Sequence, residues 1–268
     1  MATDAKGATS RLYVKRFGTG RRTYFGVHGW SGNHLTFSPL AAHLPNDASL
    51  FCVDLPGHGQ SPALPGDANL EAIGRSVAEV VLELDLRHVT MIGNCSGALV
   101  ALSAAAALGD RVARWVLIDP FAFVPWYFRV FVAPGWGRYA YYSTFANPLG
   151  RWLTNASLRR HRSSATSLTR SFNDVDHATS YRYLQLFVSL GGIDGFSSVT
   201  APADVLVGER SFAAVRESAR RWQSMWPHAR VHELAGAGHL PMQEAADQVS
   251  RIIFGSDEAD AREVGAMA

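Results

Sequence analysis

Residues 89–100 of this 268-residue chain are Val89-Thr90-Met91-Ile92-Gly93-Asn94-Cys95-Ser96-Gly97-Ala98-Leu99-Val100. A short apolar run ends in Gly-x-Cys-x-Gly and passes directly into an alanine- and leucine-rich segment that extends to residue 108. This order predicts a buried strand, a tight turn and a helix. The two glycines remove the β-carbons that would collide in such a turn, so the Cys95 side chain would stand clear of the sheet at the start of the helix.

Cys95 has two interpretations. At the start of a helix the first backbone N–H groups have no intrahelical partner, and the positive end of the helix dipole favours an anion. A thiolate at this position would gain from both effects and could act as a nucleophile. The alternative is an ordinary structural cysteine, since free cysteine is among the most often buried residue types. The motif alone leaves both open.

Strands and helices alternate on both sides of this stretch. Strands are expected at 11–17, 23–27, 49–53, 112–118, 203–207 and 230–234, and helices at 37–44, 70–84 and 211–226. A terminal helix is expected after residue 242, running to about 254. Strands separated by helices of this length favour parallel pairing through right-handed crossovers. The sequence therefore predicts an α/β fold with a mostly parallel, doubly wound sheet, formed by residues 11–120 and 199–255.

Residues 121–198 interrupt this alternation. Aromatic side chains are dense from Phe121 to Phe145, and Pro125 and Pro134 prevent one long helix. We expect a mostly helical cap inserted at 121–198. Its aromatic residues would pack the cap against the sheet domain, and some would line a pocket for an apolar or aromatic group.

The composition argues against several classes of function. Lys and Arg total 25 and Asp and Glu total 23, a net charge of +2, so the overall charge indicates neither a nucleic acid nor a membrane as partner. Two cysteines do not make a disulfide framework, which fits a reducing compartment. The sequence contains neither a secretory signal nor a run of the ~20 apolar residues that cross a bilayer. We expect a cytoplasmic protein without a metal or a cofactor.

Four motifs in this order resemble those of the α/β-hydrolase family, and the resemblance covers nearly the whole chain. The oxyanion loop is matched by His28-Gly29-Trp30-Ser31-Gly32, and the Asp-x-Pro-Gly-x-Gly-x-Ser turn by Asp54-Leu55-Pro56-Gly57-His58-Gly59-Gln60-Ser61. The nucleophile elbow is matched by Gly93–Gly97, and the histidine segment by Gly236-Ala237-Gly238-His239. The resemblance implies that Cys95 is the nucleophile and His239 its base. It also implies an oxyanion hole formed by the backbone N–H groups of Trp30 and Ser96. His28 and His58 would hold turns.

The position of the acid departs from the family pattern. The family commonly places an aspartate three residues after the glycine that ends the next-to-last strand, and here that position is Ser211. Some cap-bearing members, the haloalkane dehalogenases among them, take the acid from the end of the strand after the elbow, which is Asp119 in this chain. Asp119 is therefore preferred. Glu209, or a Cys–His pair with no acid, is the alternative.

A cysteine at the elbow resembles the dienelactone hydrolases and the polyhydroxyalkanoate synthases. The resemblance implies an acyl hydrolase or acyltransferase that acts on an ester or thioester with a bulky apolar acyl group, through an acyl-Cys95 intermediate. The run Arg159-Arg160-His161-Arg162 could contact a phosphate of coenzyme A or of a carrier protein's phosphopantetheine, or be a solvated helix face. Two alternatives stay open: an inactive scaffold that binds ligands, and a Cys95 engineered in place of serine.

Overall fold

The computed structural model describes residues 3–4, 12–63 and 68–255. Its strands are β1 Thr3–Asp4, β2 Val14–Phe17, β3 Arg22–Val27, β4 Ala48–Val53, β5 Val89–Asn94, β6 Val112–Ile118, β7 Ala203–Gly208 and β8 Arg230–Leu234. They form one sheet in the order β1-β2-β4-β3-β5-β6-β7-β8. The neighbours from β4 to β8 pair in parallel, whereas β1 and β2 join one edge antiparallel. The α/β fold with a mostly parallel sheet is confirmed.

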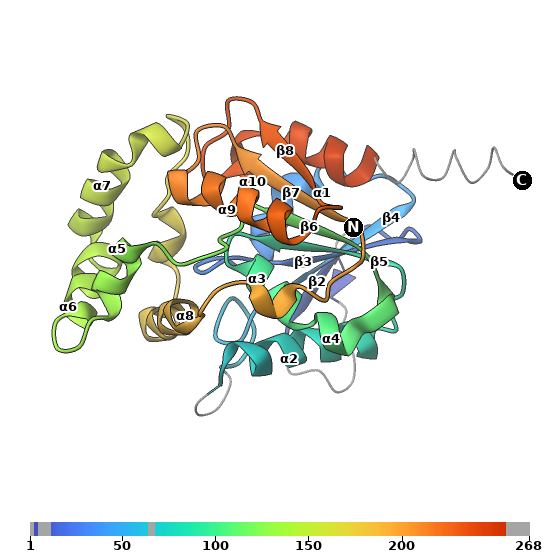
Figure 1. Ribbon diagram of the computed structural model, residues 1–268, viewed down its shortest axis with the longest axis horizontal. Coiled ribbons are helices and arrows are strands. Elements are labelled where there is room, and N and C mark those ends of the chain that lie inside the picture. The colour runs from blue at the N-terminus through green and yellow to red at the C-terminus, as the bar shows by residue number, and fades with distance from the viewer. Residues whose placement is uncertain (1–2, 5–11, 64–67, 256–268) are drawn as a thin grey trace, which may run out of the picture.

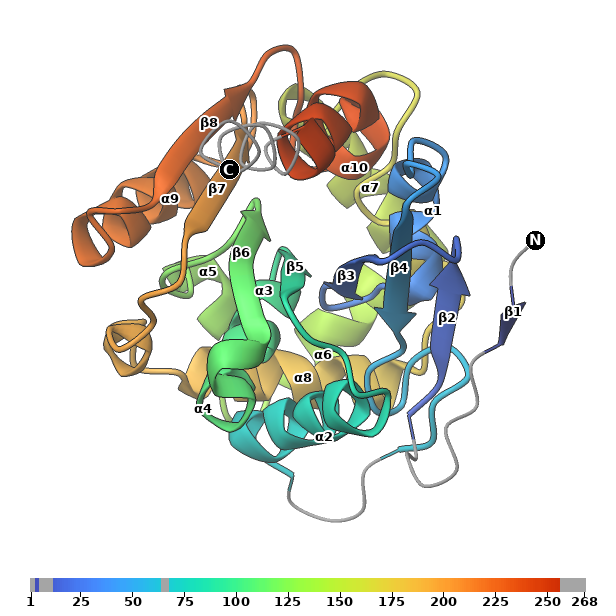
Figure 2. The same cartoon turned by 90° about the vertical axis from the view of Figure 1, so that its right-hand side faces the viewer.

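Helices cover both faces of this sheet (Figures 1 and 2). They are α1 Ser38–Ala41, α2 Leu70–Glu83, α3 Gly97–Ser103, α4 Ala105–Leu108, α9 Ala213–Met225 and α10 Pro241–Glu244, followed by a helical run at 246–255. One apolar cluster joins α2, α3 and α9 to one face of the sheet, and a second joins α1 and the run at 246–255 to the other face. The sheet is therefore buried on both sides, which is why its central strands are continuous apolar runs.

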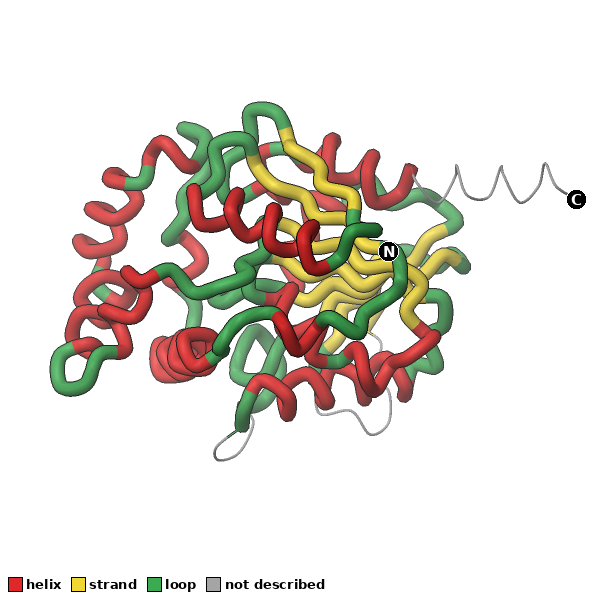
Figure 3. Tube along the Cα trace, viewed as in Figure 1, coloured by secondary structure: helices red, strands yellow, loops and turns green. Residues whose placement is uncertain are grey.

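Between β6 and β7 the chain forms helices and no strand. These are α5 Trp126–Arg129, α6 Gly137–Tyr141, α7 Pro148–Ser157 and α8 His177–Ser189, joined by short 3₁₀ and π turns. Figure 3 shows them gathered at one end of the molecule, beside the strands rather than among them. The Asn147 side chain caps α7 and the Asp176 side chain caps α8 by accepting backbone N–H groups of the first turn. The division of the chain into a core and a cap domain stays a prediction.

Several expected helices are shorter than the sequence pattern suggested. The helix expected at 37–44 is α1, preceded by a 3₁₀ turn that Asn33 caps. The helix after the elbow is divided at Ala104 into α3 and α4. The last helix is interrupted at Ala245, whose backbone is not helical. Arg11, expected to begin the first strand, lies outside the described residues.

Within the described residues, none of the helices combines the length and the apolar character that a bilayer crossing requires.

Candidate active site

Cys95 lies in the turn between β5 and α3, with a backbone φ of 52°. Such a left-handed conformation costs a non-glycine residue roughly 1–2 kcal/mol. The turn is held in place because the Cys95 N–H donates to the Ile118 carbonyl at 2.7 Å. A β-carbon on Gly97 would lie 2.3 Å from the His28 carbonyl oxygen, and one on Gly93 would lie 2.4 Å from the backbone of α3. The glycines of the motif are therefore required by close packing.

His239 and Asp119 lie in line with Cys95. The Cys95 Sγ is 3.7 Å from His239 Nε2, and His239 Nδ1–H donates to Asp119 Oδ2 at 2.8 Å. Asp119 directly follows β6 with a φ of 47°, and the His239 backbone N–H donates to the His161 carbonyl. The three side chains come from the ends of β5, β6 and β8, because the carboxyl ends of parallel strands meet at one edge of the sheet. The structure thus brings together all three residues that the sequence selected.

Ser211 binds the Asp119 carboxylate that contacts His239. Its hydroxyl donates to Asp119 Oδ2 at 2.5 Å and lies 3.2 Å from His239 Nδ1. The other oxygen, Asp119 Oδ1, accepts the Gly208 N–H at 2.8 Å. The sequence had marked Ser211 only as a departure from the family pattern. Its position three residues after Gly208 was the signal that places it beside the imidazole.

Glu209, the alternative acid, points elsewhere. Its carboxylate accepts the Gly236 N–H at 2.7 Å in an exposed position. Among the described residues only Asp119 pairs a carboxylate with His239. The geometry therefore favours Asp119 over Glu209.

The surroundings of His239 favour its protonated form. Burial by itself lowers the pKa of His239, but the hydrogen bonds to Asp119 and Cys95, with the charges of both groups, raise it to about 10. An imidazole with this pKa stays protonated through neutral pH. Burial and then the charge of Asp54 raise the pKa of the Cys52 thiol. Cys52 is fully enclosed in the sheet and stays a neutral thiol.

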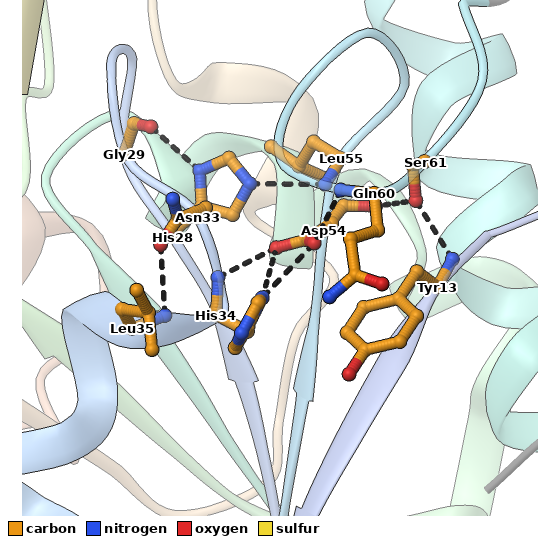
Figure 4. Close-up of polar contacts among 10 residues, drawn as sticks. All are labelled: Tyr13, His28, Gly29, Asn33, His34, Leu35, Asp54, Leu55, Gln60 and Ser61. Atoms are coloured by element: carbon orange, nitrogen blue, oxygen red, sulfur yellow. Dashed lines mark hydrogen bonds and ion pairs between the residues drawn. The ribbon is translucent and has the colours of Figure 1, made fainter. Parts of the chain in front are cut away.

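His28 forms hydrogen bonds with the turns beside the site (Figure 4). The Leu55 N–H donates to His28 Nε2 at 2.9 Å, and His28 Nδ1–H donates to the Gly29 carbonyl at 2.8 Å. Burial and the neighbouring His58 lower the pKa of His28, so its ring is neutral. Asp54 closes the network by accepting the backbone N–H groups of His34 and Gln60.

Trp30 is fixed by both its backbone and its side chain. His58 Nε2–H donates to the Trp30 carbonyl at 2.9 Å, and the Trp30 indole N–H donates to the Ser180 carbonyl at 2.6 Å. In the part of the chain that the structure describes, the backbone N–H groups of Trp30 and Ser96 have no hydrogen-bond partner. Both donors are therefore free to bind a ligand oxygen.

A cavity of about 1240 Å³ adjoins Cys95 and His239. Its wall is mostly apolar and much of it comes from the helices between β6 and β7, including Phe121, Phe128, Phe131, Phe145, Leu184 and Phe187. Other aromatic residues of this segment, such as Tyr141, are buried in its own small core. Tyr141 also contacts Trp30, so part of the segment packs against the sheet domain. The described residues hold no group of three or more histidine, cysteine or acidic side chains that could bind a metal ion.

Comparison with known proteins agrees with this architecture. Residues 27–246 match the family model described as alpha/beta hydrolase fold. The chain belongs to the α/β-hydrolase fold family. It is 27% identical to Esterase YbfF of Escherichia coli (strain K12) over 237 residues, which cover 85% of this chain and 89% of that protein. A "Serine hydrolase-like protein" of Danio rerio is 36% identical, but over only 102 residues, 37% of this chain and 31% of that protein.

A solved structure shows the same fold over almost the whole chain. The enol-lactonase from Burkholderia xenovorans LB400 superposes with a TM-score of 0.75 at 19% identity, covering 94% of this chain and 98% of that one. The hydrolase fold is therefore shared even where little of the sequence is.

Proposed function

We propose that this member of the α/β-hydrolase family is an esterase that works through an acyl intermediate on Cys95. His239 transfers the protons, and Asp119 orients the imidazole and stabilises its protonated form. One observation carries the proposal: an unbroken line of contacts from the Cys95 sulfur through the imidazole to the carboxylate, beside an apolar cavity. The similarity to Esterase YbfF supports an ester as the substrate.

In the acylation step, the Cys95 thiolate forms a bond to the acyl carbon and the carbonyl electron pair moves to its oxygen. The free N–H groups of Trp30 and Ser96 donate to this oxyanion. When the carbonyl re-forms, the bond to the leaving oxygen or sulfur breaks and His239 Nε2 gives that atom its proton. The products are a free alcohol or thiol, a neutral imidazole and an acyl-Cys95 thioester.

In the second step, His239 takes a proton from a water molecule whose oxygen attacks the thioester carbon. The carbon–sulfur bond breaks, the acid leaves, and the thiolate–imidazolium pair is restored. Transfer to an alcohol, amine or thiol follows the same path with a different acceptor. A substrate thioester exchanges with Cys95 at nearly no cost in free energy, so thioesters of coenzyme A or of a carrier protein are included in the proposed substrates.

The cavity wall indicates the acyl part of the substrate. Aromatic and aliphatic side chains from the helices between β6 and β7 favour a bulky apolar group. Of the basic run at 159–162, Arg162 donates to the Ser163 and Thr166 carbonyls. Arg159 and Arg160 are exposed and remain the candidates for a phosphate of the carrier.

Intact-mass spectrometry tests the proposal. Incubation with a panel of esters and thioesters is expected to add one acyl mass to the wild-type protein and to Cys52→Ala, and none to Cys95→Ala. Iodoacetamide should label Cys95 much faster than Cys52 and stop turnover. Hydrolysis by Cys95→Ala at the wild-type rate, or ligand binding that never yields an acyl adduct, would overturn the mechanism. A large gain of activity in Cys95→Ser would show that the site is built for serine.

A further inference from the structure

The charges of this chain are unevenly distributed along the sequence. Residues 120–173 contain seven arginines and no aspartate or glutamate. The remaining residues therefore carry 18 basic and 23 acidic side chains. The net charge of +2, from which we expected no membrane partner, is an average over a strongly cationic segment and an anionic remainder.

Helix α7, within this segment, turns its apolar stripe outward. Leu149, Trp152 and Leu153 are 63%, 65% and 53% exposed. Their spacing of three and four residues places them on one side of the helix. None of the residues of α7 is buried. An amphipathic helix in a globular protein normally packs this side against the core, so the stripe lacks the partner that its sequence fits.

Further large side chains are exposed on the neighbouring elements. Of the ten large apolar side chains that are exposed among the described residues, seven lie between positions 126 and 153. They include Trp126 at 76%, Trp136 at 54% and Tyr139 at 75% exposure. Figure 1 places α5, α6 and α7 at the end of the molecule opposite the run at 246–255. We name this set the aromatic face: Trp126, Tyr127, Trp136, Tyr139, Leu149, Trp152 and Leu153.

Cations without counter-ions accompany the aromatic face. Arg129, Arg138, Arg159 and Arg160 are exposed, and none of them forms an ion pair with another described residue. Elsewhere the exposed arginines often do, as Arg220 does with Glu217 at 2.7 Å. Arginines without ion-pair partners therefore lie in or directly after the same helices as the exposed rings.

We propose that the aromatic face docks on an anionic lipid surface. Tryptophan and tyrosine rings suit the boundary between headgroups and acyl chains, because one part of each ring is apolar and the other forms hydrogen bonds. Leucines on the same side of α7 insert among the chains, and the arginines bind the headgroup phosphates. A second copy of the chain fits less well, since a symmetric contact would bring arginines against arginines.

The aromatic face borders the cavity of the candidate site. Trp126 and Tyr127 belong to the face and also line the cavity. A protein docked in this way would take its substrate from the lipid, which fits the apolar wall. This part of the inference rests on the proposed esterase activity and names its substrate class as esters that partition into membranes.

Vesicle sedimentation tests the docking without using activity. The full chain with Cys95→Ala is mixed with vesicles of phosphatidylcholine alone or with one-third phosphatidylglycerol. We expect binding to the anionic vesicles that falls as salt is added. Replacing Arg159 and Arg160 by glutamine should weaken it roughly 30-fold, at about fivefold for each charge. Matched replacement of Arg220 and Arg221 should leave it unchanged.

A second pair of variants tests the apolar contribution. Leu149→Ser with Trp152→Ser should reduce vesicle binding at least tenfold, whereas Leu82→Ser, at an exposed position of α2, should not. Equal binding by all variants, or no binding to anionic vesicles, would overturn the proposal. Dimerisation in sedimentation velocity that the α7 variant abolishes would reassign the face to a second copy.

Hydrolysis of a water-soluble ester separates this proposal from the previous one. In otherwise wild-type protein, the α7 variant should hydrolyse it at the normal rate, since Leu149 and Trp152 lie outside the cavity wall. Vesicle binding without any hydrolysis would leave the docking intact and refute the esterase. Hydrolysis without vesicle binding would do the reverse.

Discussion

Replacing Cys95 by alanine and by glycine measures the strain of the elbow. Both variants lose the sulfur and differ only in the β-carbon, so their difference in stability reports the backbone alone. At a φ of 52° the β-carbon costs roughly 1–2 kcal/mol. Glycine lowers the stability by ~0.4–1 kcal/mol, because the unfolded chain has greater conformational freedom with glycine than with alanine. The glycine variant should therefore be more stable than the alanine variant by about 1 kcal/mol.

Position 79 provides a matched control. Glu79 is exposed in the middle of α2, where the backbone is helical. There glycine should be less stable than alanine by about 1 kcal/mol. The two alanine–glycine pairs should thus differ in sign, with a gap of about 2 kcal/mol between them.

Urea denaturation followed by circular dichroism measures the four free energies of unfolding. A change of about 1 kcal/mol corresponds to roughly 2–4 °C in the melting temperature of a chain of this size, so thermal scans give a second reading. If glycine at position 95 destabilises the protein as it does at position 79, the elbow is not strained. The reasoning that the fold forces the Cys95 side chain outward would then fail.

Three further predictions concern buried carboxylates and their partners. Asp119→Asn should lower the rate of acylation by a factor of about 10² or more, because it removes the charge that holds His239 protonated. Glu209→Gln should change this rate less than threefold, and stopped-flow assays measure both variants. Ser211→Ala should reduce the acylation rate about tenfold, because the hydroxyl no longer holds Asp119 Oδ2 beside His239 Nδ1, while Ser211→Thr should restore the rate. An unchanged acylation rate would show that the hydroxyl only fills space. Burial raises the pKa of Asp204, but the hydrogen bond from His232, the charge of Arg114 and the hydrogen bond from Arg230 hold it at about 2 rather than 3.8. The Asp204 charge therefore stabilises the fold above pH 4, and about 2 kcal/mol is lost as the pH falls towards 2. The destabilisation caused by Asp204→Asn should therefore shrink by that amount between pH 7 and pH 2, and an equal effect at both would contradict the linkage.

The sequence predicted the central strands well because each is a short apolar run between polar turns. β6 and β8 begin and end where the pattern placed them. Helix boundaries were predicted less well, since they depend on individual side-chain bonds. The interruption at Ala104 falls within an alanine-rich run, so no periodicity of apolar residues reveals it.

The candidate site was predictable to the extent that backbone geometry sets it. The parallel strand ends bring positions 95, 119 and 239 together, and each position followed a recognisable strand in the sequence. The role of Ser211 was not predictable, because a hydroxyl at that position has no meaning until the carboxylate it binds is known to be Asp119. The choice between Asp119 and Glu209 likewise depended on which side chain reaches the imidazole.

The fold sets the positions of the site residues through backbone contacts. Backbone hydrogen bonds of the Cys95 and His239 N–H groups hold positions 95 and 239 in place. These bonds involve neither the sulfur nor the imidazole. A cysteine can therefore occupy the elbow without disturbing it. An acid could follow either β6 or β7, because side chains after both strands reach the same imidazole nitrogen, as the contacts of Asp119 and Ser211 with His239 Nδ1 show. A serine in place of the family's aspartate after β7 is thus compatible with a carboxylate that contacts His239.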